Sequence, residues 1–224
     1  MIEDPSATVA LKKMTTRRAV LAVFALAIAA GAFVLLKPPP GPRSIRVFDP
    51  DRMASLEVDM WQAYYRKENI RLFRGLLLTL HEQYRYSWAQ AGITGFYLAR
   101  AAVSFATLSS NYERVLPDLE RAYRRIREWT GGGFDPASVA RAELAWWVAR
   151  RVPGQDSPEN VGRLIADENA QLFEVPADRV IVASVLRARA GRLRDAGGEQ
   201  ADWNTVAALL HQSYRELHEA VNKP

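Results

Sequence analysis

Three glutamates stand at helical spacing among apolar residues and could carry chemistry inside a folded domain. Glu57 lies between two methionines, Glu143 precedes a tryptophan pair by one helical turn, and Glu168 continues a row of aliphatic residues. Burying an unpaired carboxylate is costly, so each of them needs a partner or a raised pKa. Arg100, the one charged residue of the most apolar stretch, and Arg189 are the candidate partners. We therefore predict a buried polar cluster of these five residues.

Two interpretations fit such a cluster. One is a structural network of Glu–Arg and Glu–Tyr hydrogen bonds that fixes the register of the helices. The other is a metal or small-molecule site inside a helical bundle, as in carboxylate-bridged di-iron proteins. Those proteins use Glu-x-x-His, whereas the positions three residues after the glutamates hold Met60, Trp146 and Gln171. A ferritin-like di-iron site is therefore not expected. We predict no cofactor, and a metal belongs only to the second interpretation.

Motifs for other chemistries are missing from the sequence. It has no cysteine, which excludes disulfides, thiolate metal sites and thiol nucleophiles. Its three histidines, His81, His211 and His218, form no His-x-x-x-His pair, and no Gly-x-Ser-x-Gly segment occurs. The glycine run 131–133 lacks the lysine of a phosphate-binding loop and reads as a helix stop. The sequence thus assigns no catalytic residue and leaves open whether the protein is an enzyme.

Aromatic residues gather in three short segments of the sequence. Neighbouring residues on a helix point about 100° apart, so adjacent aromatics are hard to bury together. We expect one member of each pair to lie at a surface groove that suits a partner protein or an apolar ligand. The candidates for this groove are Trp61, Tyr65, Trp88, Trp146 and Trp147.

The elements that would position these residues are all predicted to be helices. Apolar residues recur at helical spacing from Asp49 onward, and proline and glycine separate the segments. The second helix is expected to run from Asn69 to about Gln90, and the segment 96–109 is expected to be the central buried helix. The predicted starts lie near Asp49, Asn69, Phe96, Val115, Asp135, Ser157, Pro176 and Asp202. We predict one compact all-α domain of about eight helices packed as antiparallel hairpins, with a solenoid as the second choice.

An apolar run precedes this domain. Ala19–Leu36 contains no charged residue and spans about 27 Å as a helix, close to the thickness of a membrane core. Three interpretations compete: an uncleaved anchor, a secretory peptide cleaved near Ala32, and a twin-arginine signal built on Arg17 and Arg18. We favour the anchor, because the apolar run continues past Ala32 and ends at a proline-rich segment.

The domain boundaries and the charge follow from this anchor. We predict a cytoplasmic tail (1–18), the anchor (19–36), a Pro-rich spacer (37–48) and an extracytoplasmic helical domain (49–224). The net charge is +5, but residues 1–42 hold five basic and two acidic residues, so +3 belongs to them and only +2 to the rest. A nucleic-acid-binding domain is therefore not expected. The basic flank predicts a single span in a bacterial inner membrane, with the N-terminus in the cytoplasm and the domain in the periplasm.

The function predicted from these features is an assembly module. A single-pass membrane protein would present its helical domain to a protein partner in the bacterial envelope. The alternative is an envelope enzyme, or a protein that binds a metal or small molecule through the buried Glu, Tyr and Arg residues. Self-association is a weaker prediction, based on the small-residue pair Ala27 and Gly31 in the span.

Overall fold

The computed structural model describes residues 23–223, in two units that divide after Lys37. In the first unit, residues 23–36 are helical. The first residues of the predicted anchor, 19–22, and the predicted tail lie outside the described residues. Of the helices that the structure describes, none combines the length and the apolar character needed to cross a membrane.

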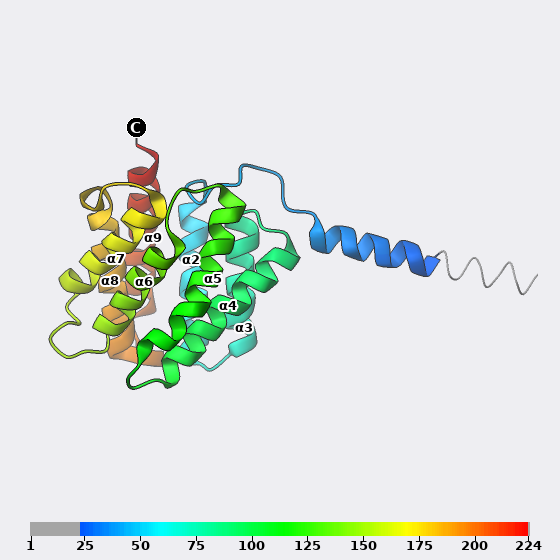
Figure 1. Ribbon diagram of the computed structural model, residues 1–224. Helices are drawn as coiled ribbons and strands as arrows, with labels where there is room; N and C mark the ends of the chain where they lie inside the picture. Colours follow the sequence, from blue (N-terminus) through cyan, green and yellow to red (C-terminus); the bar gives the residue numbers. More distant parts are fainter. Residues whose placement is uncertain (1–22, 224) are drawn as a thin grey trace, which may run out of the picture. The chain divides into compact units, whose positions relative to one another are not determined.

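The second unit is built of α-helices, which confirms the predicted all-α class for the described residues (Figure 1). No strand occurs between residues 38 and 223. The eight α-helices are α2 (Pro50–Tyr65), α3 (Asn69–Leu78), α4 (Trp88–Thr107), α5 (Leu116–Thr130), α6 (Pro136–Ala149), α7 (Pro158–Phe173), α8 (Ala177–Gly197) and α9 (Trp203–Asn222). A π-helical turn, η1 (Thr79–Gln83), continues α3, and short 3₁₀ turns precede α5 and α9.

Most of these helices begin where capping chemistry predicts. The side chains of Asp49 and Asp135 accept hydrogen bonds from backbone N–H groups of the first turn, and proline follows each of them. Ser157 and Asp202 cap α7 and α9 in the same way. Gly131 ends α5 with φ of 70°, a left-handed conformation that glycine adopts without strain.

The boundary between α3 and α4 differs from the prediction. The helix expected to reach Gln90 ends in the π-helical turn, and α4 begins at Trp88. The reason is a capping box: the Ser87 hydroxyl accepts from the Gln90 N–H, and the Gln90 side chain accepts from the Ser87 N–H. Gly95, which falls between the predicted second helix and the predicted segment 96–109, lies inside α4, where a Cβ would approach Leu77 to 3.1 Å.

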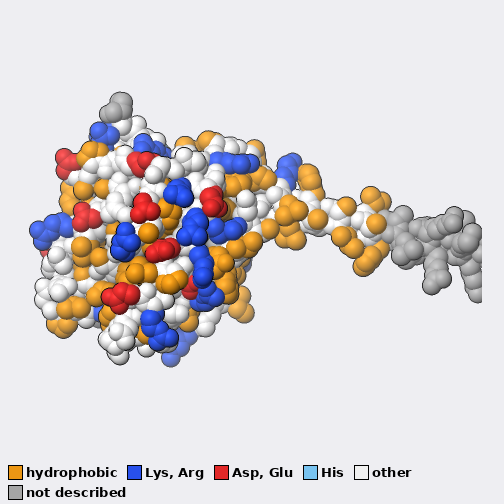
Figure 2. Space-filling view, in the orientation of Figure 1, with side chains coloured by type: hydrophobic (Ala, Val, Ile, Leu, Met, Phe, Trp, Pro, Cys, Tyr) orange, Lys and Arg blue, Asp and Glu red, His pale blue; other side chains and the backbone are white. Residues whose placement is uncertain are grey.

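The segment predicted to be the central buried helix lies instead at the edge of the domain. Ile93, Phe96 and Val103 of α4 are about half exposed or more. The main neighbours of α4 are α3 and α5 with their adjoining short turns, and they leave these side chains uncovered. Figure 2 shows hydrophobic side chains along this edge of the domain, next to a row of basic side chains over α5.

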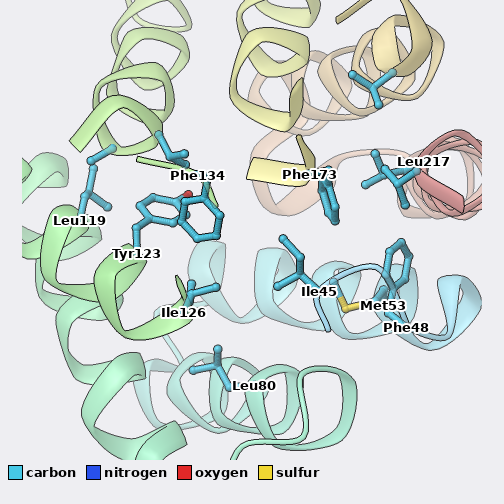
Figure 3. Close-up of a cluster of buried hydrophobic side chains, with 14 of the residues drawn as sticks. Ile45, Phe48, Met53, Leu80, Leu119, Tyr123, Ile126, Phe134, Phe173 and Leu217 are labelled. Carbon is cyan, nitrogen blue, oxygen red and sulfur yellow. The ribbon is translucent and has the colours of Figure 1, made fainter. Parts of the chain in front are cut away.

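The eight helices close into a ring. Each packs against the next along the chain, and α9, the last, packs against α2, the first. Because the ends of a solenoid do not meet in this way, the domain is a closed bundle. The buried side chains of this ring form its main core, part of which Figure 3 shows.

The end of the predicted spacer belongs to this core. Ile45 and Phe48 are each only 7% exposed. Both lie beside the buried side chains of Met53, Phe173 and Leu217 (Figure 3).

Between these two apolar residues, an arginine joins the last turns of two helices. The guanidinium of Arg46 donates to the backbone carbonyls of Phe173 and Val221, which satisfies acceptors that the ends of α7 and α9 leave open. The spacer therefore ends inside the folded domain.

Candidate functional site

A cavity of about 260 Å³ lies inside the ring of helices. Most of its wall is apolar, and its polar part consists of carboxyl, guanidinium, amide and hydroxyl groups. Thr79 of the π-helical turn lies in the wall, and so does Tyr84 directly after that turn; π-turns are frequent at functional sites. The other polar residues of the wall are Tyr123, Glu143, Glu168, Asn169, Ser184, Arg187, Ser213 and Tyr214.

The first polar group of the cluster is an ion pair between α2 and α8. Arg187 donates from Nη2 to Glu57 Oε1 at 2.5 Å and from Nε to Oε2 at 3.3 Å. Tyr214 of α9 donates its hydroxyl to the same Oε2 at 2.7 Å. Glu57 is 5% exposed, so both of its oxygens have partners in the interior. This bidentate pair is the arrangement that a buried carboxylate requires.

The second group surrounds Glu168 of α7. The Tyr123 hydroxyl of α5 donates to Oε1 at 3.0 Å, and the Trp146 indole N–H of α6 donates to Oε2 at 2.5 Å. Burial raises the pKa of Glu168, while the charge of Arg187 and these two donors lower it. Glu168 thus uses one hydrogen bond at each oxygen to hold α5, α6 and α7 together.

The third group is Glu143 of α6, whose carboxyl lacks part of its hydrogen bonding. Its Oε2 atom is buried and has no hydrogen-bond partner. Burial, followed by the nearby charge of Glu168, raises the pKa of Glu143 to about 8, although Tyr123 and Arg187 oppose the shift. Near neutral pH this carboxyl therefore holds a proton in the native protein. A carboxyl that titrates close to pH 7 and faces a cavity is typical of functional sites.

The tyrosines of the cavity act as neutral donors. Burial, followed by the charges of Glu57 and Glu168, raises the pKa of Tyr84 to about 12. The pKa values of Tyr123 and Tyr214 are raised well above the usual tyrosine value, chiefly by burial. None of the three is a phenolate at neutral pH, whereas the pKa of Glu143 lies close to neutral pH.

The structure brings together part of the predicted polar cluster. Glu143 and Glu168 line the same cavity, and Glu57 joins them through Arg187. The two predicted partners, Arg100 and Arg189, lie elsewhere.

Both predicted partners form surface ion pairs. Arg100 is 44% exposed and donates from Nε to Asp118 at 2.6 Å, because α4 lies at the edge of the domain. Arg189 is 53% exposed and faces Glu159. Leu193, one helical turn further along α8, is 41% exposed on the same side.

The predicted aromatic groove is not formed by one set of residues. Trp146 points into the core toward Glu168, whereas Trp147 packs edge-on against Phe105. Trp61 lies under the Arg194 guanidinium and lines a small pocket together with Trp146. Tyr65 is bonded to Asp195, and Trp88 is stacked on His81 at 3.8 Å.

Three site residues were not singled out by the sequence: Tyr123, Arg187 and Tyr214. The signal for Arg187 lies in the small residues of α8. Its buried face follows Ala183, Ser184, Ala190 and Gly191, and Arg187 falls on that face. The two tyrosines lie at helical spacing with buried leucines, among which a tyrosine usually serves as core filling.

Metal coordination finds little support in this geometry. Within residues 23–223, no three side chains of the His, Cys, Asp and Glu types are grouped so that they could hold a metal ion. The histidines are bound to other groups: His81 Nδ1 to the Tyr86 carbonyl at 2.7 Å, and His211 to Asp51 at 2.9 Å.

Comparison with known proteins gives no relative for this chain. No family model matches it, and neither the curated proteins nor the solved structures yield a match.

Proposed function

We propose that the protein is a membrane-tethered binding protein whose helical ring encloses a small organic ligand. The observation that carries this proposal is the buried, unpartnered Oε2 of Glu143 at the wall of a 260 Å³ cavity. Buried polar atoms almost always have a partner, so an open acceptor beside an empty volume favours a ligand that supplies the donor.

The size and lining of the cavity agree with this function. An apolar cavity of about 150 Å³ holds a molecule as large as benzene. The larger cavity of this protein, with an apolar wall and a few converging polar groups, is typical of small-molecule sites. The same carboxyl could serve as a general acid or base, so an enzyme that uses this site is the closest variant of the proposal.

The proposed location rests on the N-terminal segment. The apolar run 19–36, its basic flank and the prolines that follow it support a single-pass anchor in a bacterial inner membrane, with the domain on the periplasmic side. The tether would keep the binding domain close to the membrane surface.

A thermal shift experiment tests the binding function by comparing the wild type with a variant in which a larger side chain fills the cavity. We expect a neutral probe such as 2-phenylethanol to raise the Tm by about 5 to 10 °C at a hundred-fold excess over its Kd. Ala183→Leu adds bulk at the cavity wall and should abolish the shift, whereas Ala102→Leu on the exposed face of α4 should keep it. Equal shifts in the two variants would place the probe outside the cavity.

An assembly module is the second candidate function, and the exposed face of α4 supports it. Ile93, Phe96 and Val103 are 47%, 52% and 64% exposed on this helix. Arg100, the only charged residue within α4, already pairs with Asp118. An apolar face without an unpaired charge suits a second copy of the chain across a two-fold axis.

Sedimentation velocity tests this assembly. We expect the wild-type protein to sediment as a dimer and Phe96→Ser/Val103→Ser as a monomer. Val182→Ser, at a 55% exposed position on α8, should remain dimeric. A monomeric wild type at all concentrations would exclude the self-assembly function.

A further inference from the structure

The polar cluster contains more carboxyl groups than basic groups. Three carboxyls, those of Glu57, Glu143 and Glu168, belong to the cluster, against the single guanidinium of Arg187. Arg187 directs two N–H groups at Glu57, and it is the only Lys, Arg or His among the described residues that line the cavity. Glu143 and Glu168 therefore face the cavity with the charge of Arg187 nearby but without a cation hydrogen-bonded to them.

The open hydrogen-bonding capacity of the cluster lies at Glu143. Glu168 already accepts one hydrogen bond at each oxygen, from Tyr123 and from Trp146. Oε2 of Glu143 accepts none. A ligand that brings a hydrogen-bond donor and a positive charge would complete this carboxyl, whereas an anion would meet two carboxyls with no free cation beside them.

We infer that the ligand is an organic monocation, an ammonium group on a small apolar body, and that it takes the place of the proton on Glu143. The inference rests on the proposed binding function. The bound ammonium donates to the ionised carboxylate of Glu143, and the displaced proton passes to the buffer. The apolar body occupies the hydrocarbon part of the cavity, whose wall includes Leu80 and Phe173.

Electrostatics gives the direction of the pH dependence. The groups that face Glu143 are Tyr123 of α5, Glu168 of α7 and Arg187 of α8, and together with burial they leave its pKa at about 8. A cation within hydrogen-bond distance lowers a carboxyl pKa by about one to three units. Binding at pH 7 therefore releases a proton, and the affinity for the cation rises with pH until Glu143 is ionised in the free protein.

Three probes of similar size test the inference: phenethylammonium, its neutral analogue 2-phenylethanol and the anion phenylacetate. Each is titrated calorimetrically into the full-length protein in detergent, with the detergent alone as a blank. Two buffers of different ionisation enthalpy give the number of protons released. We expect phenethylammonium to bind at least about ten-fold more tightly than the alcohol, phenylacetate to bind weakest, and only the cation to release a proton at pH 7.

The outcomes separate this inference from the proposed function. If the alcohol or phenylacetate binds as tightly as the cation, the cation inference is overturned and the binding function stands. If none of the three probes binds, both are overturned. If the cation binds without releasing a proton, the exchange at Glu143 is overturned.

Substitution of Glu143 tests whether this carboxyl is the one that gives up a proton when the cation binds. Glu143→Gln keeps the size of the side chain but cannot ionise, so we expect it to bind phenethylammonium at least about ten-fold more weakly, without proton release and without pH dependence. Glu113→Gln, at an exposed position, is the matched control and should behave as the wild type. The wild-type series with the three probes decides the question even if Glu143→Gln does not fold.

Discussion

Two arginines on α8 show how strongly the surroundings determine the role of a residue. Arg187 and Arg189 are two residues apart, so they point to different sides of the helix. Arg187 forms the buried pair with Glu57, whose side chain is only 7% exposed. Arg189 faces Glu159 at the surface, where both side chains are more than half exposed.

Removing the two cations should therefore have very different effects. Arg187→Met leaves the carboxylate of Glu57 buried without its cation, and we expect a loss of about 3–5 kcal/mol in the free energy of unfolding. Arg189→Met should change it by less than about 1 kcal/mol, because exposed ion pairs contribute little. Urea denaturation of both variants measures the difference. Equal losses would show that the buried pair contributes no more than the surface pair.

The protonated carboxyl of Glu143 should be visible in the pH dependence of stability. Its pKa is about 8 in the native protein and close to the ordinary 4.5 when unfolded. Between these values the native state holds the extra proton, so the free energy of unfolding falls as pH rises, by up to about 1.4 kcal/mol per unit.

Glu143→Gln removes this group from the titration. We expect the variant to lose that part of the slope between about pH 5 and pH 8, so its stability relative to the wild type increases with pH. Glu113→Gln should keep the wild-type slope. Denaturation curves across this pH range provide the measurement, and an unchanged slope in Glu143→Gln would mean that Glu143 is already ionised near neutral pH.

The sequence was informative about the carboxyls of the site and uninformative about their partners. Helical spacing among apolar residues is a sufficient signal for a buried glutamate, and Glu57, Glu143 and Glu168 were found in this way. The choice of arginine failed because Arg187 lies on the buried face of α8, which follows its small residues, whereas Arg189 lies at the surface.

Among the features of the helices, the capping residues at their starts were easier to predict from the sequence than the breaks between helices. An Asp or Ser followed by proline marks a helix start through local hydrogen bonds alone, and α2, α6 and α7 begin at such pairs. The π-helical turn after α3 has no comparable local signature. α3 ends in this turn, and α4 begins at Trp88, directly after the Ser87 cap.

Two glycines allow a matched test of how closely the helices pack. A Cβ at Gly162 of α7 would lie 2.8 Å from the Cα of Val185 on α8, whereas a Cβ at Gly92 of α4 would have no neighbour within 4 Å. We expect Gly162→Ala to destabilise the fold by about 1–3 kcal/mol, because backbone must move apart. Gly92→Ala should stabilise it by up to about 1 kcal/mol.

Thermal unfolding compares these two substitutions directly. A lowered Tm for Gly162→Ala together with a raised Tm for Gly92→Ala would support the close approach of α7 and α8. If Gly162→Ala is as stable as the wild type, the two helices are farther apart than the backbone contact with Val185 requires.

For the whole molecule, the all-α class and the approximate number of helices followed from the sequence. The closure of the ring did not, because the contact between α2 and α9 joins the two ends of the domain and depends on the path of every helix between them. The boundary at the spacer was also missed, since only the assembled core shows that Ile45 and Phe48 are buried.

The proposed anchor gives a prediction at this scale. The full chain should stay with the membranes after an alkaline carbonate wash, and residues 38–224 alone should be released into the supernatant. Both should unfold at the same temperature, because residues 38–224 form a unit of their own. A full chain that is released by the wash would contradict the anchor.

The contact between the two ends of the domain means that the chain could begin at a different helix of the ring. Asn222 donates to the Arg46 carbonyl at 3.0 Å, so the end of α9 touches the segment that leads into α2. Domains with adjacent termini tolerate circular permutation. A short linker could join these ends while the chain is opened at the exposed Gly154, between α6 and α7. Such a permutant would keep the cavity and every ion pair around it, although its chain would begin with α7 and end with α6.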